Sequence, residues 1–527
     1  MQHKCIYKYL YTVQRTMKFI FAYLLVSLSI VSYAQVPETN PTINFGNHWI
    51  FGRNVHLEFS DDTIYQYEIS DMDWLEGTGN YSDSSDTYYI GKSSSGEFLR
   101  KVNSTIFQPN VAGSETATQG HLLLKHIESE TLYLLGSNSG GVAYYYKLGP
   151  DSIVTSVSRR PFKGGEKQQA VNHQNGRDIW YANHAQTGDS IYFFLIQKDG
   201  MIECPVVTHT GNSYEDDAAT QGQMKFSTDG KFLAEASWIK PFSVGLYHFN
   251  NEYPTTDSIY ILKKENEPDY SKRFFYGLEF SPDSKKLYFT EGRKFTGLPP
   301  VTVNQFDLSN LDGDNIYNSW FNLDTLFNLD IGVLQLAPNG KIYLAMPNQT
   351  YLGVINNPNE LGTACNYERE GLTLDSGGTS LYGLPTFNQS YFFTPQIDYR
   401  YEEDCQTNKY QFWGADTFGA TSFEWRFKDV RNKTLDVKSG KNISYTFSQA
   451  DSLENTYEVT FIASSGSKTD SITKTLTIRP KLTKDFLGKD TFYCEDQNFE
   501  ITLSTPSNMH CIHWDGLEPY SNLAGDT

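Results

Sequence analysis

Hydrophobic and polar residues alternate over short stretches along most of the chain, which is the period of a β-strand and not that of a helix. Residues 422–427 (SFEWRF) and 457–462 (YEVTFI) are two examples. Aromatic residues make up 15% of the chain, and they often stand beside Thr, Val and Ile, which also favour strands. No long stretch has convincing helical periodicity. The pattern predicts an all-β protein built from many short strands.

One motif recurs through the first 390 residues. An apolar strand ends in a turn of the Pro-Asp-Gly type, from which a second strand returns, at residues 226–233 (FSTDGKFL), 280–287 (FSPDSKKL) and 336–343 (LAPNGKIY), with a degenerate copy at 171–180 (VNHQNGRDIW). The turn residues Asn175, Asp229, Asp283 and Asn339 are 54, 54 and 56 residues apart. Asp, Asn and Gly accommodate the backbone of tight turns, so each copy predicts a hairpin. Weaker copies are expected to turn at Gly96 and near Glu130.

A period of about 50 residues holds four strands with their loops, and repeated units of this size are typical of propeller blades. We therefore predict that residues 40–395 form a seven-bladed β-propeller, with six or eight blades as alternatives. A stack of β-sandwiches is the competing arrangement, but it does not need one hairpin motif at near-constant spacing. To close the ring, we expect residues 44–51 to supply a strand to the last blade, near residues 383–392.

Two further β domains are predicted after the propeller. Residues 396–480 contain several alternating strands, which fit a single β-sandwich. In residues 485–527, a strand that begins at Cys494 is expected to lie across the domain from the segment with Cys511 and Trp514. A disulfide packed near a tryptophan is an immunoglobulin-like arrangement. Because this last stretch is shorter than the roughly 100 residues of such a domain, we interpret it as incomplete and the chain as a truncated gene product.

The N-terminal segment has the pattern of a secretion signal. Lys18 precedes an apolar run at residues 19–31, and Ser32 and Ala34 occupy the −3 and −1 positions of a cleavage site before Gln35. The run is shorter than the roughly 20 residues that cross a bilayer, so residues 1–34 predict a cleaved signal peptide and not an anchor. The true start is expected at Met17, and no other stretch is apolar enough to span a membrane.

Composition narrows the choice of partners. The chain has 43 basic and 62 acidic residues, a net charge of −19, and removing residues 1–34 with their four basic residues would leave −23. A protein this acidic is a poor partner for nucleic acid or for an anionic membrane surface. The sequence therefore predicts a soluble domain array with a protein or carbohydrate ligand.

Five cysteines follow the predicted cleavage site: Cys204, Cys365, Cys405, Cys494 and Cys511. Export permits disulfides, and an odd number leaves at least one cysteine free or paired with another chain. Cys494–Cys511 is the preferred pair by local context, and Cys365–Cys405 is a second possibility. No Cys or His spacing is typical of a zinc site.

No catalytic motif stands out. The chain lacks a GxSxG elbow, a P-loop and an HExxH helix, and the expected cofactor set is empty. Acidic loops at residues 312–315 (DGDN) and 215–217 (EDD) leave calcium open as an alternative. His173 and His184 flank the degenerate hairpin and are expected to be turn or surface residues.

Several segments resemble one family of exported Bacteroidetes proteins, whose propeller-like region precedes PKD and immunoglobulin-like modules. They are Trp49-Ile-Phe-Gly52, residues 276–283 (YGLEFSPD), 334–343 (LQLAPNGKIY), 352–359 (LGVINNPN), 365–367 (CNY), 383–385 (GLP) and 389–392 (QSYF). The likeness extends over residues 40–480, and residues 422–462 follow the strand order of a PKD domain. Residues 62–120 lack the family pattern, the turn at 425–429 (WRFKD) lacks its glycines, and no terminal sorting domain is present.

The resemblance implies a gliding-motility-associated protein exported by the type IX secretion system to the outer face of the cell. It also implies O-glycan acceptors in the tripeptide Asp-Ser-Ile, at Ser152, Ser190, Ser258 and Ser471; a polar entry into a strand is the alternative. The sequence as a whole predicts a non-enzymatic, cell-surface binding or scaffold protein, associated with the cell envelope, that recognises its ligand through the propeller. A propeller-based polysaccharide hydrolase or lyase is the competing prediction.

Overall fold

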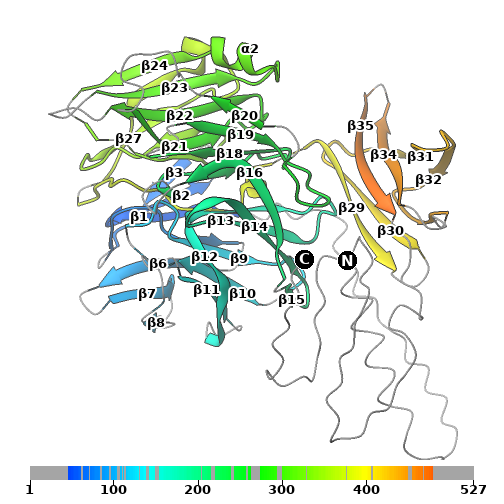
Figure 1. Ribbon diagram of the computed structural model, residues 1–527, viewed down its shortest axis with the longest axis horizontal. Coiled ribbons are helices and arrows are strands. Elements are labelled where there is room, and N and C mark those ends of the chain that lie inside the picture. The colour runs from blue at the N-terminus through cyan, green and yellow to red at the C-terminus, as the bar shows by residue number, and fades with distance from the viewer. Residues whose placement is uncertain are drawn as a thin grey trace, which may run out of the picture.

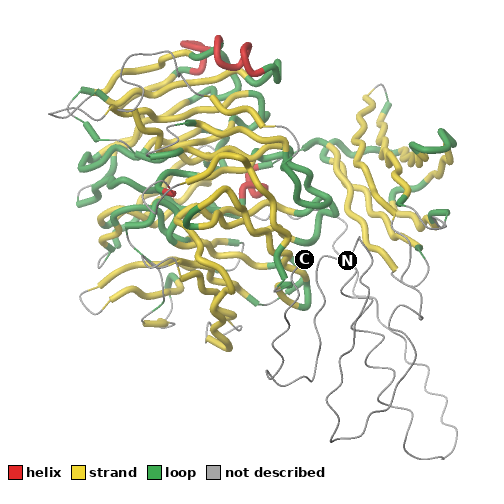
Figure 2. The backbone as a smooth tube through the Cα atoms, viewed as in Figure 1, coloured by secondary structure: helices red, strands yellow, loops and turns green. Residues whose placement is uncertain are grey.

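The computed structural model describes residues 45–478. Its internal gaps of four residues or more are 138–141, 149–153, 215–219, 239–242, 263–272, 294–299 and 449–453. The predicted signal peptide (1–34) and the predicted third domain (485–527) lie outside the described residues. Figure 2 shows that the described chain is almost entirely strand and loop, with a few short helices. The protein is all-β, as the alternating pattern predicted.

Residues before the sandwich form six antiparallel sheets over the described part of the chain, one of them eight-stranded. Because the two halves of β12 in that sheet pair with β11 and with β13, it comprises two blades, and the propeller has seven (Figure 1). The first three comprise β1 (His48–Arg53), β2 (Val55–Ser60), β3 (Thr63–Gln66) and β4 (Asp73–Trp74); β5 (Asn80–Ser82), β6 (Thr87–Ser93), β7 (Gly96–Lys101) and β8 (Phe107–Pro109); and β9 (His121–Lys125), β10 (Leu132–Ser137), β11 (Val142–Leu148) with the first half of β12 (Val154–Asn172). The predicted blade number is confirmed.

The remaining blades follow the same order. Blade 4 comprises the second half of β12, β13 (Ile179–Ala185), β14 (Gly188–Gln197), β15 (Gly200–Met201) and β16 (Val206–Tyr214), and blade 5 comprises β17 (Met224–Phe226), β18 (Phe232–Ala236), β19 (Val244–His248) and β20 (Ile259–Leu262). Blade 6 comprises β21 (Arg273–Phe280), β22 (Lys286–Arg293), β23 (Val301–Asp307), α2 (Gly313–Asn318) and β24 (Phe321–Leu326), and blade 7 comprises β25 (Leu334–Leu336), β26 (Ile342–Leu344), β27 (Tyr351–Ile355), η3 (Gly362–Cys365) and β28 (Tyr367–Thr373).

The predicted hairpins join the first and second strands of blades 4 to 7. At Asp229, for example, Ser227 N donates to Phe232 O, and Gly230 has φ +67°, a left-handed conformation that glycine adopts without strain. The turn near Glu130 lies in the same place in blade 3. Gly96 does not: it lies between the second and third strands of blade 2, and the first turn of that blade is closed by Asp83 N donating to Asp86 O. Because residues 83–86 (DSSD) lack the Asp-Gly or Asn-Gly pair of the repeated motif, the sequence did not identify this turn.

The ring closes differently from the prediction. The first segment does not join the sheet of blade 7; β1 pairs with β2 and β4 in a sheet of its own. The chain returns to this sheet after β28, where Arg53 and Thr379 exchange backbone hydrogen bonds and Tyr382 N donates to Leu75 O. Trp49 packs against Phe387 of this closing segment (379–392) and Tyr343 of blade 7. Closure therefore buries the first and last segments in one core.

The axis of the propeller is filled by a polar network. Lys225, Glu279 and Gln335 stand at the same register in β17, β21 and β25, each one residue before the last pair of its hairpin. Lys225 Nζ lies 2.9 Å from Glu279 Oε2 and 2.5 Å from Gln335 Oε1. Gln389 of η4 (Gln389–Phe392), in the closing segment, donates to the other oxygen of Glu279. The four side chains are buried, so at this level of the axis they contact one another.

A β-sandwich follows, made from two sheets with the strand orders β29-β30-β33 and β32-β31-β34-β35. Its strands are β29 (Ile397–Asp404), β30 (Lys409–Asp416), β31 (Ser422–Asp429), β32 (Leu435–Ser439), β33 (Asn442–Thr446), β34 (Asn455–Ser465) and β35 (Lys468–Ile478). Every second residue of β34 is buried, which is what the alternating pattern predicts for a strand with one face on a core. The core forms a cluster separate from those of the propeller, with Trp425 and Phe461 at its centre.

The degenerate hairpin holds the sandwich against the propeller. Gln174 Nε2 donates to Thr475 O, and Lys474 Nζ donates to Gln174 O. Glu252, in the loop between β19 and β20, accepts from Thr477 N and Oγ1. Arg177 lies 2.9 Å from Glu402. The copy of the motif that departs most from the consensus is thus the one whose polar side chains bind the second domain.

The cysteine predictions have mixed outcomes. Cys365 is buried and free, so the alternative pair Cys365–Cys405 is wrong: the thiol lies at the end of η3, within the propeller core. Cys204 is disulfide-bonded. Cys494 and Cys511 also lie outside the described residues. In the described part of the chain, no helix is both long and apolar enough to cross a bilayer.

Candidate functional site

The strongest candidate site lies where the inner strands begin, at the end of the propeller axis opposite the sandwich. The inner strands run from this end toward the first hairpins, and the sandwich contacts the hairpin of blade 4 at the other end. Glycines bring the strands together here: a Cβ on Gly77 would lie 2.1 Å from Thr118 O, and one on Gly383 would lie 2.0 Å from the carbonyl carbon of Glu76. Only glycine fits such a close approach.

Two carboxyl groups meet at this end, which we call the mouth. Glu166 comes from the start of the blade-4 half of β12, and its Oε2 accepts from Thr118 N at 3.0 Å and from Thr118 Oγ1 at 3.2 Å. Glu76 lies just before the inner strand of blade 2, near Tyr276 of β21. Glu76 Oε2 and Tyr276 Oη are buried atoms that form no hydrogen bond of ordinary length among the described residues, although the two side chains and Thr118 lie near enough to interact. The mouth therefore places a carboxyl group, a phenol and a hydroxyl next to the carboxylate of Glu166.

The pKa of Glu76 is strongly perturbed. Burial raises the pKa of Glu76 to about 8, the charge of Glu166 adds to the rise, and Tyr276 and Thr118 oppose it. Glu76 is therefore protonated at neutral pH and is able to donate a hydrogen bond, which an ionised carboxylate cannot do. Tyr382, which donates to Asp330 Oδ2 at 2.5 Å, stands next to Glu76. The mouth thus contains an acidic donor, carboxylate acceptors and phenol groups.

The protonation of Glu76 predicts a pH-dependent stability. Because its pKa rises from 4.5 in the unfolded chain to about 8 in the folded one, the stabilising contribution is complete below pH 4.5 and is lost as the pH rises to 8. We expect the unfolding free energy of the wild type to fall over this window by up to about 1.4 kcal/mol per pH unit. The Glu76→Gln variant, which keeps a neutral group of the same shape, should lose this dependence. Denaturant titrations at several pH values measure it, with the exposed Glu68→Gln as the matched control; an unchanged slope in Glu76→Gln would contradict the assignment.

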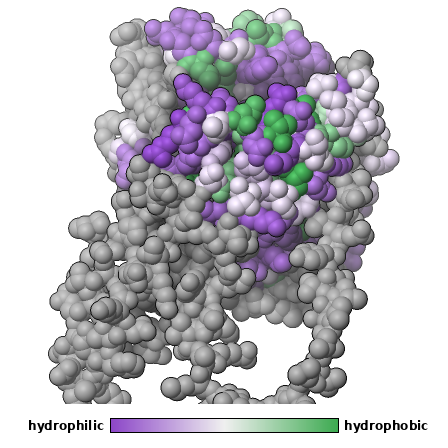
Figure 3. Space-filling model, turned by 90° about the vertical axis from the view of Figure 1, so that its right-hand side faces the viewer, coloured by the Kyte–Doolittle hydropathy of each residue, from purple (hydrophilic) through white to green (hydrophobic). Residues whose placement is uncertain are grey.

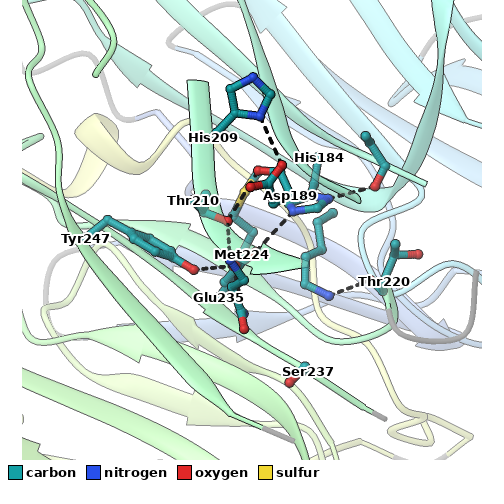
Figure 4. Close-up of polar contacts among 12 residues, drawn as sticks. His184, Asp189, His209, Thr210, Thr220, Met224, Glu235, Ser237 and Tyr247 are labelled. Carbon is teal, nitrogen blue, oxygen red and sulfur yellow. Dashed lines mark hydrogen bonds and ion pairs between the residues drawn. The ribbon is translucent and has the colours of Figure 1, made fainter. Parts of the chain in front are cut away.

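A second, fully buried polar cluster lies between blades 4 and 5 (Figure 4) and adjoins the mouth through Lys167, the neighbour of Glu166. Glu235 of β18 accepts from Tyr247 and from Asn212 Nδ2, and its Oε2 lies 3.7 Å from His184 Nε2. Burial lowers the pKa of His184, an effect that the charge of Glu235 opposes. Lys167 Nζ donates to Thr220 O at 2.6 Å and to Gln221 O at 3.0 Å. These contacts fix the backbone that carries Glu166.

Sequence reasoning did not find the mouth. Glu76, Thr118, Glu166 and Tyr276 belong to four blades and form no motif along the chain; the one local signal is the glycine that follows Glu76 and Tyr276. His173 and His184 were expected at turns or on the surface. His173 is a turn residue, although a buried one, and the prediction is wrong for His184, which is buried within β13. His173 accepts from Asn175 N within its hairpin, and His184 belongs to the cluster of Figure 4.

The predicted modification and calcium residues lie apart from the mouth. Ser190 is in β14, 3.3 Å from His209 Nδ1, and Ser471 is an exposed residue within β35; Ser152 and Ser258 fall outside the described residues. Asp312 accepts from Asn315 N as the N-cap of α2, and residues 215–217 are not described. Over the described ranges, no group of three or more His, Cys, Asp or Glu side chains could hold a metal ion.

No protein-family profile matches this chain, and no curated protein matches it either. Among solved structures, it is similar to candidate 6-phosphogluconolactonases from Bacteroides uniformis (12% identity, TM-score 0.40, 62% of this chain and 97% of that chain) and Bacteroides fragilis (13%, 0.40, 64% and 98%). It is also similar to the β-propeller domain of Cps50 (Swd1) from Myceliophteria thermophila (10%, 0.33, 75% and 99%). Likeness at this level carries no argument about activity or ligand.

Proposed function

We propose that this chain is an exported recognition protein whose propeller binds a neutral, polyhydroxylated ligand, such as a glycan, at the mouth. The observation that carries the proposal is the protonated Glu76 beside Glu166. Sugar hydroxyls both donate and accept hydrogen bonds, and the mouth offers an acid that donates, a carboxylate that accepts and the hydroxyls of Thr118 and Tyr276. Specific sites of this kind rely on a few well-placed polar groups.

Charge supports a neutral ligand over an anionic one. Asp330 and Glu166 stand near Glu76, and the chain carries −19 overall. Such a field repels polyanions. Acidic polysaccharides are therefore poor candidates, while neutral or amino-substituted glycans are compatible with the mouth.

A glycan array tests this proposal. The chain from Gln35 onward, tagged at its C-terminus, should bind neutral glycans, and Glu166→Gln should weaken that binding at least tenfold, since an amide is a poorer acceptor than a carboxylate. The exposed Glu68→Gln is the matched control and should bind as the wild type does. A blank array would remove the carbohydrate version of the proposal.

Hydrolysis of a glycan is the alternative that the same carboxyl pair supports. A carboxyl with a raised pKa next to a second carboxyl is the arrangement by which glycosidases combine an acid with a base or nucleophile. Incubation with neutral polysaccharides, followed by a reducing-end assay, separates the two functions. Release of sugar by the wild type and not by Glu76→Gln would establish an enzyme, and unchanged polysaccharide would favour recognition.

Export and surface location rest on the signal at residues 1–34 and on the family resemblance. We propose that the protein stands on the outer face of the cell, with the sandwich as a spacer, and contributes to attachment or gliding. The mature N-terminus should be Gln35 by Edman sequencing of the exported protein. A deletion strain that attaches and spreads normally would contradict the role in adhesion or gliding.

A further inference from the structure

The sandwich contains a pocket of about 450 Å³, which falls within the range of small-molecule sites. It is lined by residues of β31, β32, β33 and β34 and of the loops next to them. Figure 3 views the molecule from the side of the sandwich and shows hydrophobic side chains within a mostly hydrophilic surface. Leu435, at the rim of the pocket, is one of the exposed hydrophobic residues of this domain.

Aromatic rings form much of the lining. Phe427, Tyr445 and Tyr457 all line the pocket, and Tyr445 stacks on Phe427 with ring centroids 3.7 Å apart. Tyr445 is thereby held in one orientation. Burial raises its pKa to about 12, with the charge of Asp436 adding to the rise, so its hydroxyl is protonated at neutral pH. Rigid aromatic rings with a polar end suit ligands that are apolar on one face and polar at the edge.

Polar groups of the lining are arranged around Asp429. Its Oδ1 accepts from Asn432 N at 2.8 Å, and its Oδ2 accepts from Asn432 Nδ2 at 3.1 Å and from Asn455 Nδ2 at 2.8 Å. Because a carboxylate only accepts, these bonds fix which end of the Asn455 amide is the NH₂ group. Asn455 Oδ1 is then a buried acceptor without a hydrogen-bond partner among the described residues, and the cost of burying it is recovered when a donor reaches it.

Charges around the pocket nearly balance. Asp436 pairs with Lys438 at 3.3 Å, and Arg431 lines the pocket together with Asp429. A strongly charged ligand would therefore gain little electrostatic binding energy. The combination of aromatic rings, fixed amide and carboxylate groups and balanced charge matches a sugar, whose apolar face stacks on a ring while its hydroxyls bond around the edge.

We propose that this pocket of the sandwich is a second, independent binding site for a neutral sugar residue. The sandwich then contributes to recognition as well as to spacing. The site does not rest on the mouth of the propeller, because no residue is shared between the two and the cores of the two domains are separate.

Saturation-transfer NMR on the chain from Gln35 onward tests the proposal with methyl glycosides of glucose, galactose, mannose and N-acetylglucosamine, and with cellobiose, maltose and lactose. At least one should bind, and its affinity should fall at least tenfold in Tyr445→Ala and in Leu435→Glu. Leu435 is 57% exposed, so the second variant keeps its fold. Matched controls are Tyr65→Ala and Leu361→Glu, at positions 50% and 52% exposed on the propeller.

Three results would overturn the proposal. The first is that none of these sugars binds. The second is a sugar that binds Tyr445→Ala and Leu435→Glu as well as the wild type, and the third is an equal loss in the control variants. A sugar whose binding is lost only in Glu166→Gln belongs to the mouth of the propeller and would support the proposed function alone.

Discussion

Replacing Lys225 with methionine should destabilise the propeller by about 3–5 kcal/mol, the cost of removing one partner of a buried ion pair. Lys225 and Glu279 are both fully buried on the axis, 2.9 Å apart. Burial lowers the pKa of Lys225 and raises the pKa of Glu279, and each partner opposes the shift of the other. Without the ammonium group, the carboxyl of Glu279 keeps only its bonds to Gln389 and to the backbone.

Differential scanning calorimetry measures this effect. The sandwich has its own core, so we expect separate transitions, and only that of the propeller should move to lower temperature. The matched control is Lys231→Met, at a side chain 74% exposed in the hairpin of the same blade. The double variant Lys225→Met/Glu279→Gln should recover part of the loss, because it removes the unpaired charge. Equal melting of Lys225→Met and the wild type would show that the pair does not hold the axis together.

The second large effect is expected for Trp49→Ala, which should also cost about 3–5 kcal/mol. Trp49 is fully buried, and its ring contacts three parts of the closure: Phe59 of its own sheet, Tyr343 of blade 7 and Phe387 of the closing segment. Its Nε1 donates to Gly46 O. The substitution leaves a cavity where the first and last segments meet, so the ring should open there first.

Hydrogen exchange locates that opening. In Trp49→Ala we expect faster exchange in β1, in the closing segment and in blade 7, while blades 3 and 4 keep their protection. Tyr65→Ala, at an exposed position on β3 of the same blade, removes an aromatic ring without a cavity and serves as the control. A uniform loss of protection around the ring would contradict the view that closure depends on this residue.

The two effects show how closure and the mouth depend on one another. The closing segment that packs on Trp49 also carries Gln389 into the axis and places Gly383 against the backbone of Glu76. A propeller in which this segment is displaced would lose a polar partner on the axis and the support of its candidate site together. Variants of Trp49 should therefore be compared with Glu76→Gln before any loss of binding is assigned to the mouth.

The hairpins were predictable because their chemistry is local. Asp229 with Gly230, or Asn339 with Gly340, specifies a tight turn within a few residues, and the spacing of the copies carries the period of the blade. Blade 2 shows the limit of this signal: its first turn uses Asp83 and Asp86, without glycine, and Gly96 marked a different hairpin. The core of the sandwich was equally predictable from the sequence, since hydrophobic and polar residues alternate in β31 and β34 when one face of each strand is buried.

The sequence by itself determined an all-β chain with a repeated four-stranded unit and a sandwich after it, because turn residues and alternation act over short distances. Only the tertiary structure decided how the ring closes, which side chains fill the axis and where carboxyl groups meet. Glu76 and Glu166 are far apart in the chain, and so are Lys225 and Gln389. Their proximity, and the burial that raises the pKa of Glu76, come from the convergence of inner strands on one axis, which no local pattern encodes.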